Sequence, residues 1–182
     1  MNLPDAEKLF EALVARLSGH VAPDTGIVGI VTGGAWLAER LHRALGVRSP
    51  LGVLDPSFYR DDFNKAGLHH QVKPSQIPFE VEGRGVLLVD DVLFTGRTVR
   101  GAMNELFDYG RPSRIDLAVL VDRGGRELPV AAQYVGASLE VPPGGVLVLD
   151  RGPSGGFSLT LSDTRRRRTA PGAAREPTPG PK

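Results

Sequence analysis

The chain has 182 residues, of which 41% are hydrophobic and 24% are charged, a balance typical of a single soluble globular domain. It contains no Cys, which excludes disulfides, thiol nucleophiles and thiolate metal sites, and no apolar run approaches the roughly 20 residues that a membrane-spanning helix needs. The formal net charge of +1 is the sum of a slightly acidic body and a basic stretch at residues 163–182. A uniformly basic nucleic-acid-binding domain is therefore not indicated.

Helices and buried strands are predicted to alternate from the N-terminus onward. The first residues lack a basic segment followed by an apolar one, so we expect no secretory signal and a cytoplasmic location. Apolar residues at three- and four-residue spacings predict an amphipathic helix over 4–17. The short β-branched run at 27–31 predicts a strand buried on both faces, and a Thr-Gly-Gly turn separates it from a second helix at 35–45.

The middle of the chain contains a long polar excursion between predicted strands. Residues 51–60 and 77–81 are expected to be strands, and the segment that joins them is either a mobile lid or a surface segment. A further strand at 86–89 leads through a loop into a helix at 98–109.

Shorter apolar runs follow toward the C-terminus. Residues 115–121 form a third buried run, and the runs at 133–139, 146–150 and 157–162 suggest edge strands or a closing hairpin. The alternation of strands and helices predicts an α/β fold with a mostly parallel central sheet and helices on both faces.

Two adjacent carboxylates, Asp90 and Asp91, follow the buried run at 86–89. Two anions at the end of a buried strand are costly unless something binds there, and ligands of open parallel sheets bind beyond the carboxyl ends of the strands. The turn at 95–98 leads into a helix, whose positive amino end suits a phosphate, and Gly96 allows close approach to it. A sugar with a terminal phosphate fits both the two acids and the turn. Its hydroxyls can donate hydrogen bonds to the carboxylates, and its phosphate can bind at the amino end of the helix.

A plainer interpretation of this segment stays open. Asp90 would cap the strand, Asp91 would face solvent, and residues 95–98 would only start the helix through a Ser/Thr-type N-cap. Two other phosphate-binding motifs are excluded, because the chain has no Gly-Lys-Thr Walker loop and no Gly-x-Gly-x-x-Gly turn after its first strand.

The segment 86–98 resembles the phosphoribosyl-pyrophosphate (PRPP) binding motif of type I phosphoribosyltransferases, in which a strand, two acids and a small-residue loop precede a helix. Three stretches are similar to the PyrR family: YRDDF at 59–63, TGRTVRGAMNELFDYGRP at 95–112 and LAVLVDRGGRELPVAAQYVG at 117–136. Its members are known as uracil phosphoribosyltransferases and as regulators of pyrimidine genes that bind messenger RNA. The resemblance implies the type I phosphoribosyltransferase fold, with a small hood and flexible loop.

By this resemblance, the two acids hold the ribose hydroxyls of PRPP and the loop holds its 5-phosphate. The implied PRPP-binding residues are Asp90, Asp91, Val92, Leu93, Phe94, Thr95, Gly96, Arg97 and Thr98. Thr32, Gly33 and Gly34 occupy the place of the pyrophosphate loop of the family. Many relatives have Arg at the position of Gly33, so either Arg60 supplies that contact or the reaction is weakened.

A lid over the nucleotide is implied for about residues 55–81. It contains Arg60, which together with Asp90 and Asp91 makes up the implied catalytic set. A lid that excludes water makes chemical sense, because the activated sugar of PRPP would otherwise hydrolyse. We expect residues 1–162 to form the phosphoribosyltransferase domain and 163–182, rich in Pro, Gly and Arg, to be a disordered tail.

The base pocket is implied at the end of the third buried run. Asp122 and Arg123 would flank uracil, and Arg123 could donate a hydrogen bond to a base carbonyl. The neighbouring charges, Arg126 and Glu127, could equally pair with each other at the surface.

The implied reaction converts uracil and PRPP to UMP and pyrophosphate, with Mg²⁺ held by the substrate and not directly by the protein. One alternative is an RNA-binding attenuator that senses UMP and PRPP with weak or no catalysis, with pyrimidine-operon leader mRNA as its partner. Another is a phosphoribosyltransferase for a different base, such as orotate or a purine. The family further implies a homodimer or a dimer of dimers.

Overall fold

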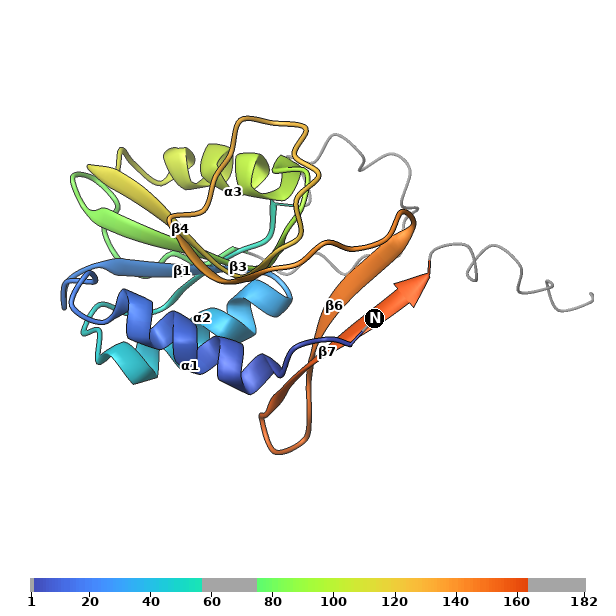
Figure 1. The fold of residues 1–182 in the computed structure, drawn as a ribbon. Coiled ribbons are helices and arrows are strands. Elements are labelled where there is room, and N and C mark those ends of the chain that lie inside the picture. The colour runs from blue at the N-terminus through green and yellow to red at the C-terminus, as the bar shows by residue number, and fades with distance from the viewer. Residues whose placement is uncertain (1, 57–74, 164–182) are drawn as a thin grey trace, which may run out of the picture.

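The computed structural model describes residues 2–56 and 75–163, and its centre is a parallel five-stranded sheet (Figure 1). Its strands are β1 (Gly26–Ile30), β2 (Gly52–Leu54), β3 (Gly85–Leu93), β4 (Arg114–Asp122) and β5 (Tyr134–Ser138). They lie in the order β2-β1-β3-β4-β5, and all neighbours pair in parallel. Every residue of β1 is buried, as expected for an interior strand that is covered on both faces.

Helices cover both faces of this sheet (Figure 1). The helices α1 (Ala6–Leu17) and α2 (Gly33–Leu45) lie on one face, and α3 (Arg97–Asp108) lies on the other. The adjacent residues Leu87 and Leu88 of β3 belong to different apolar cores, because successive side chains of a strand point to opposite faces. Within the described ranges, every helix is too short or too polar to cross a membrane. The predicted α/β fold with helices on both faces is confirmed.

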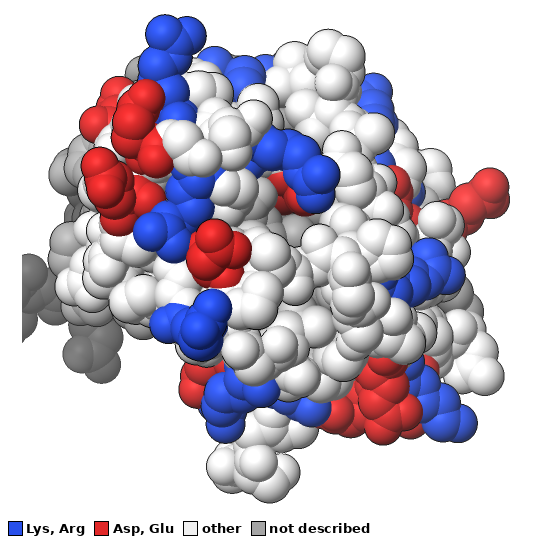
Figure 2. Space-filling model, turned by 90° about the vertical axis from the view of Figure 1, so that its left-hand side faces the viewer, with Lys and Arg blue, Asp and Glu red and all other residues white. Residues whose placement is uncertain are grey.

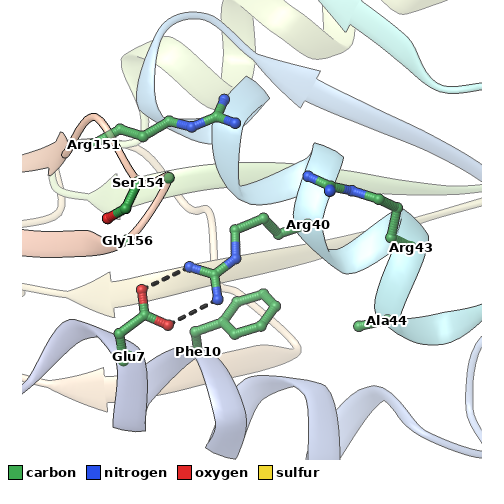
Figure 3. Close-up of a pocket in the computed structure, with 9 residues that line it drawn as sticks. Glu7, Phe10, Arg40, Arg43, Ala44, Arg151, Ser154 and Gly156 are labelled. Atoms are coloured by element: carbon green, nitrogen blue, oxygen red, sulfur yellow. Dashed lines mark hydrogen bonds and ion pairs between the residues drawn. The ribbon is translucent and has the colours of Figure 1, made fainter.

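A separate antiparallel hairpin of β6 (Gly145–Arg151) and β7 (Phe157–Asp163) follows the sheet, as the C-terminal runs predicted. It is joined to the helices through Arg40 of α2, which donates to both carboxylate oxygens of Glu7 in α1, at 2.7 and 2.8 Å (Figure 3). The guanidinium also lies 4.1 Å from the ring centre of Phe10 and 4.4 Å from that of Phe157. Glu7 accepts the Phe157 amide at 2.6 Å, so one ion pair connects two helices and the hairpin.

The strand predicted at residues 77–81 is not present, which corrects the sequence-based assignment. Gln76 alone forms an antiparallel bridge, with Val53 of the edge strand β2. Pro78 has no N–H to continue such a ladder, and edge positions are where Pro is found in sheets. The side chain of Phe79 instead packs against the core on the α3 side.

Two other strands differ from their predicted lengths. The strand expected at 51–60 is limited to β2 among the described residues, because positions 57–74 lie outside them. The strand expected at 86–89 extends to Leu93, since β4 continues as its partner as far as the pair Leu93–Asp122. The two acids therefore lie inside the last part of β3 and not after it.

Candidate active site

The carboxyl ends of β1, β3 and β4 lie at one edge of the sheet, where α2 and α3 begin (Figure 1). Asp90 and Asp91 lie on β3 at this edge. Asp90 is only 6% exposed, and its Oδ1 accepts a hydrogen bond from the Asp91 amide at 3.0 Å. Asp91 is half-buried. Two carboxylates are thus held close together at the edge where parallel sheets bind ligands.

The first turn of α2 packs directly on these acids. A Cβ added at Gly34 would lie 2.5 Å from the Val89 carbonyl oxygen and 2.8 Å from the Cα of Asp90. A Cβ at Gly33 would lie 2.3 Å from Oδ2 of Asp91. The Val31–Thr32 peptide bond before this turn is cis. The structure therefore brings the predicted pyrophosphate loop against the predicted ribose-binding acids. The space between them accommodates glycine but no larger residue at positions 33 and 34.

The loop between β3 and α3 encloses a cavity of about 110 Å³. The cavity is lined by Asp90, Val92, Leu93, Phe94, Thr95, Gly96, Thr98 and Val99. Gly96 is the N-cap of α3 and has a φ of 90°, a conformation that L side chains rarely adopt. Asp90 and the predicted 5-phosphate loop thus share one cavity.

The amino ends of α2 and α3 carry no side-chain cap. Neither Thr32 at the start of α2 nor Gly96 at the start of α3 caps its helix through a side chain. In α1, by contrast, Asp5 accepts hydrogen bonds from two amides of the first turn. The ordinary Ser/Thr-type N-cap is therefore not found for α3, although the Thr95 hydroxyl accepts the Arg97 amide at 3.3 Å. Two helix amino ends face the acidic edge in a form suited to anions.

The loop that follows β4 packs on the loop that follows β3. Asp122 accepts the Gly124 amide at 2.9 Å through Oδ1 and pairs with Arg126 through Oδ2. Arg123 donates from Nη1 to the Gly145 carbonyl at 2.9 Å, and its guanidinium lies 4.1 Å from the ring centre of Phe94. Burial lowers the pKa of Arg123, whose Nε is buried with no hydrogen-bond partner in ranges 2–56 and 75–163. Both predicted uracil-binding residues thus already contact protein groups.

Comparison with known proteins decides the family. A family model described as the phosphoribosyl transferase domain matches residues 3–143. A protein from Ralstonia nicotianae named Bifunctional protein PyrR is 51% identical over 170 residues, which are 91% of this chain and 97% of the relative. A protein of the same name from Pseudomonas fluorescens is 52% identical over 143 residues, 76% of this chain and 85% of the relative.

This chain belongs to the PyrR group of phosphoribosyltransferases. Solved phosphoribosyltransferases have the same fold. A hypoxanthine phosphoribosyltransferase of Trypanosoma cruzi aligns with a TM-score of 0.61 at 19% identity, over 86% of this chain and 94% of that one. A hypoxanthine-guanine phosphoribosyltransferase of Bacillus anthracis also aligns with a TM-score of 0.61 at 19% identity, over 76% of this chain and 83% of that one. The predicted family and fold are confirmed.

The pairing of Arg126 with Glu127 that the sequence allowed is wrong in this phosphoribosyltransferase. Arg126 pairs with Asp122, and Glu127 pairs with Arg97 at 2.8 Å. The reason is that the β4 loop folds back over the β3 loop, so Glu127 meets Arg97 of α3, while Arg126 turns toward Asp122 at the end of β4. Hydrophobic spacing carries no signal for such contacts between loops.

Two further predictions for the phosphoribosyltransferase site concern Arg60 and the metal ion. Arg60 lies outside the described residues. Within 2–56 and 75–163, no group of three or more His, Asp or Glu side chains is placed to hold a metal ion.

A second cavity, of about 640 Å³, lies away from the acidic edge of the phosphoribosyltransferase, between α1, α2 and the hairpin (Figure 3). Arg40 in its wall pairs with Glu7, as described above. Arg43 and Arg151 pair with the two oxygens of Glu39, at 3.1 and 2.8 Å. Because each of these guanidinium groups already contacts a carboxylate, we interpret this cavity as the junction of the hairpin with the helices.

Proposed function

We propose that this chain is a uracil phosphoribosyltransferase, which converts uracil and PRPP to UMP and pyrophosphate. The observation that carries the proposal is the juxtaposition of Asp90 and Asp91 with Gly33 and Gly34 on one side and the loop at 95–98 on the other. PRPP has a diol between two phosphate-bearing ends, and this edge has two carboxylates between two uncapped helix amino ends.

In this proposal each part of the edge has one task. Asp90 and Asp91 accept hydrogen bonds from the ribose hydroxyls, the amino end of α3 holds the 5-phosphate, and Thr32 to Gly34 hold the pyrophosphate. Carboxylates would repel the phosphates, so their place between the two helix ends supports a sugar there. Holding both ends of PRPP aligns its anomeric carbon with the base and lowers the entropy cost of the reaction.

The chemistry needs no covalent nucleophile. Positive charge develops on the ribosyl ring as pyrophosphate leaves, and the two carboxylates can offset that charge at close range. Mg²⁺ bound to PRPP would neutralise the negative charge of the diphosphate. The carboxylates of Asp90 and Asp91 are hard oxygen groups that fit this ion through bridging water. Arg60 is proposed to approach the pyrophosphate from the segment outside the described residues.

The uracil side of the site is proposed at Asp122 and Arg123. Arg123 lies beside the PRPP loop, above Phe94, and its Nη2 has no hydrogen-bond partner within the described residues. That N–H group is available to a carbonyl oxygen of the base. Asp122 supports this loop through its contacts with Gly124 and Arg126.

The direct test is pyrophosphate release from PRPP, measured side by side with uracil, orotate, hypoxanthine and adenine. We expect release with uracil alone and a strong loss of PRPP use in Asp90→Asn. Equal release with another base would overturn the assignment of uracil, and unchanged PRPP kinetics in Asp90→Asn would overturn the assignment of the site.

Regulation through RNA is the second function that we propose, because relatives that are about half identical to this chain carry the name Bifunctional protein PyrR. The face at the amino ends of the strands carries basic and acidic side chains side by side (Figure 2). Sequence-independent RNA binding needs an excess of basic groups, and a face of mixed charge does not supply one. The proposal therefore includes a homodimer that gathers basic side chains such as Arg48 and Arg111 from both subunits on one surface. We expect binding to pyrimidine-operon leader RNA that responds to UMP in a gel-shift assay, and binding that ignores UMP would contradict a sensor.

A further inference from the structure

The guanidinium group of Arg126 lies between the loops that follow β3 and β4, and all three of its nitrogens are engaged. Nε donates to the Val130 carbonyl at 3.0 Å. Nη1 donates to the carbonyl of Phe94 and, at 3.3 Å, to that of Gly124. Nη2 pairs with Oδ2 of Asp122. One side chain therefore bonds to the PRPP loop and to three positions of its own loop.

This arrangement is partly shielded from solvent. The side chains of Arg126 and Asp122 are each 23% exposed. Charge-assisted hydrogen bonds in such a setting are stronger than neutral ones, and the planar guanidinium can address several acceptors in fixed directions. A Lys ammonium is a point charge, so it could pair with Asp122 but could not span the same carbonyls.

Other contacts from the β4 loop fix the same part of the PRPP loop. The amides of Glu127 and Leu128 both donate to the Thr95 carbonyl, at 3.0 and 3.1 Å. The Phe94 ring lies under the Arg123 guanidinium, and a Cβ at Gly125 would lie 2.4 Å from a carbon of this ring. The residues just before the phosphate-binding turn thus have their backbone and a side chain held by the β4 loop.

We propose that Arg126 is a positioning residue for the 5-phosphate loop, a role that rests on the proposed function. It touches neither substrate. It fixes the Phe94 carbonyl and so sets where the amides at the start of α3 point. Asp122 in turn orients Arg126, which gives this acid a role on the PRPP side of the site as well as beside the base.

The test compares Arg126→Gln and Arg126→Lys with wild type, and Arg16→Gln is the matched control. Arg16 is exposed in the last turn of α1, and its side chain makes no hydrogen bond or ion pair within the described part of the chain. The measurements are KM for PRPP, KM for uracil, direct binding of PRPP by calorimetry and the thermal midpoint of unfolding.

We expect Arg126→Gln to raise KM for PRPP about tenfold or more, because a misplacement of about 1 Å at a binding site can cost on the order of 100-fold. KM for uracil should change far less, and Arg126→Lys should recover only part of the loss. Arg16→Gln should match wild type. A merely structural role would instead lower the thermal midpoint and leave the ratio of the two KM values unchanged, which would overturn the proposal.

Asp122→Asn separates the two roles of that acid. If Asp122 acts through Arg126, it should raise KM for PRPP, and Asp122→Asn combined with Arg126→Gln should be no worse than Arg126→Gln alone. A rise in KM for uracil alone would show that Asp122 serves only the base. Calorimetry keeps the proposals distinct: absence of PRPP binding in wild type would overturn the proposed function, whereas equal binding in wild type and Arg126→Gln would overturn this inference only.

Discussion

Gly33 and Gly34 mark the point where a helix backbone contacts the two acids of β3. The neighbours of the two glycines differ in kind. A Cβ at Gly34 would meet backbone atoms of Val89 and Asp90, whereas one at Gly33 would meet the side chain of Asp91. Backbone in a central strand cannot move aside, but a side chain can rotate, so the two glycines should tolerate substitution differently.

We expect Gly34→Ala to destabilise the fold by about 1–3 kcal/mol, the usual cost of forcing a methyl group into a packed site. Gly33→Ala should cost less stability, but it should raise KM for PRPP because Asp91 must leave its position. Thermal unfolding and PRPP kinetics of both variants check this expectation. Equal stability losses would argue against the difference between backbone and side-chain neighbours.

Glu127 provides a second residue-level prediction. It pairs with Arg97 at 2.8 Å, at the start of the helix proposed to hold the 5-phosphate, and both side chains are 41% or more exposed. Replacing Glu127 by Gln removes a negative charge near the phosphate and one partner of Arg97. We expect KM for PRPP to fall about two- to fivefold, consistent with exposed pairs worth about 1 kcal/mol or less. The gain should shrink at high ionic strength, and a higher KM would show that the pair helps PRPP binding.

At the level of elements, the hairpin β6–β7 is joined to α1 and α2 by the pair of Glu7 and Arg40. Hydrogen bonds from Arg40 lower the pKa of Glu7 below the ordinary 4.5, although burial opposes the shift. A carboxyl group with a lowered folded-state pKa stabilises the fold above its unfolded-state pKa. That contribution is lost as the pH falls through the folded-state value.

Glu7→Gln should therefore cost about 1–2 kcal/mol at neutral pH, an amount discounted because the Glu7 side chain is 38% exposed. The cost should disappear at a pH well below 4.5, once the pH has fallen through the lowered folded-state pKa and wild type has lost the same charge. Denaturant unfolding at the two pH values measures both numbers. A cost that stays constant with pH would mean that the ion pair is not its source.

Glu105 on α3 is predicted to behave in the opposite way. Burial raises its pKa above 4.5, although a side-chain hydrogen bond with Ser75 opposes the shift, and Oε2 is buried with no hydrogen-bond partner among the described residues. A carboxyl group with a raised folded-state pKa loses stability as the pH rises from its unfolded-state pKa through the folded-state value, so Glu105→Gln should stabilise the protein at neutral pH and not below pH 4.5. The same unfolding experiments test this sign, and a destabilised variant at pH 7 would contradict it.

For the whole molecule, the excess of basic over acidic residues lies in residues 163–182, while every described site residue lies before Asp150. We proposed residues 1–162 as the catalytic domain, and residues 164–182 lie outside the described ones. A chain that ends at Asp163 should keep its KM for PRPP and its uracil-dependent pyrophosphate release. If the basic segment contributes phosphate contacts to RNA binding, the truncated chain should show a weaker salt dependence in gel shifts. Loss of catalysis would place part of the site in this segment.

Much of the fold could be predicted, because its signals are local. The β-branched run before Gly33 and the spaced apolar residues of α1 and α2 each lie within one element. The prediction of a strand at 77–81 was wrong, because a segment that packs across the edge of a sheet also needs apolar residues. Pro78 has no N–H group and cannot continue a ladder of hydrogen bonds there. For the site, the PRPP segment is contiguous, so its residues could be predicted together.

By itself the sequence determined the α/β class and the family, and it predicted the PRPP segment, since hydrophobic periodicity and a contiguous motif can be recognised along the chain. Only the tertiary structure decided that Gly33 and Gly34 lie against Asp91 and the β3 backbone, and that Arg126 bonds to the carbonyl of Phe94. These contacts join residues far apart in sequence, and the parallel register of β1, β3 and β4 brings them to one edge. No local pattern records that register, because it results from packing of the whole sheet against both layers of helices.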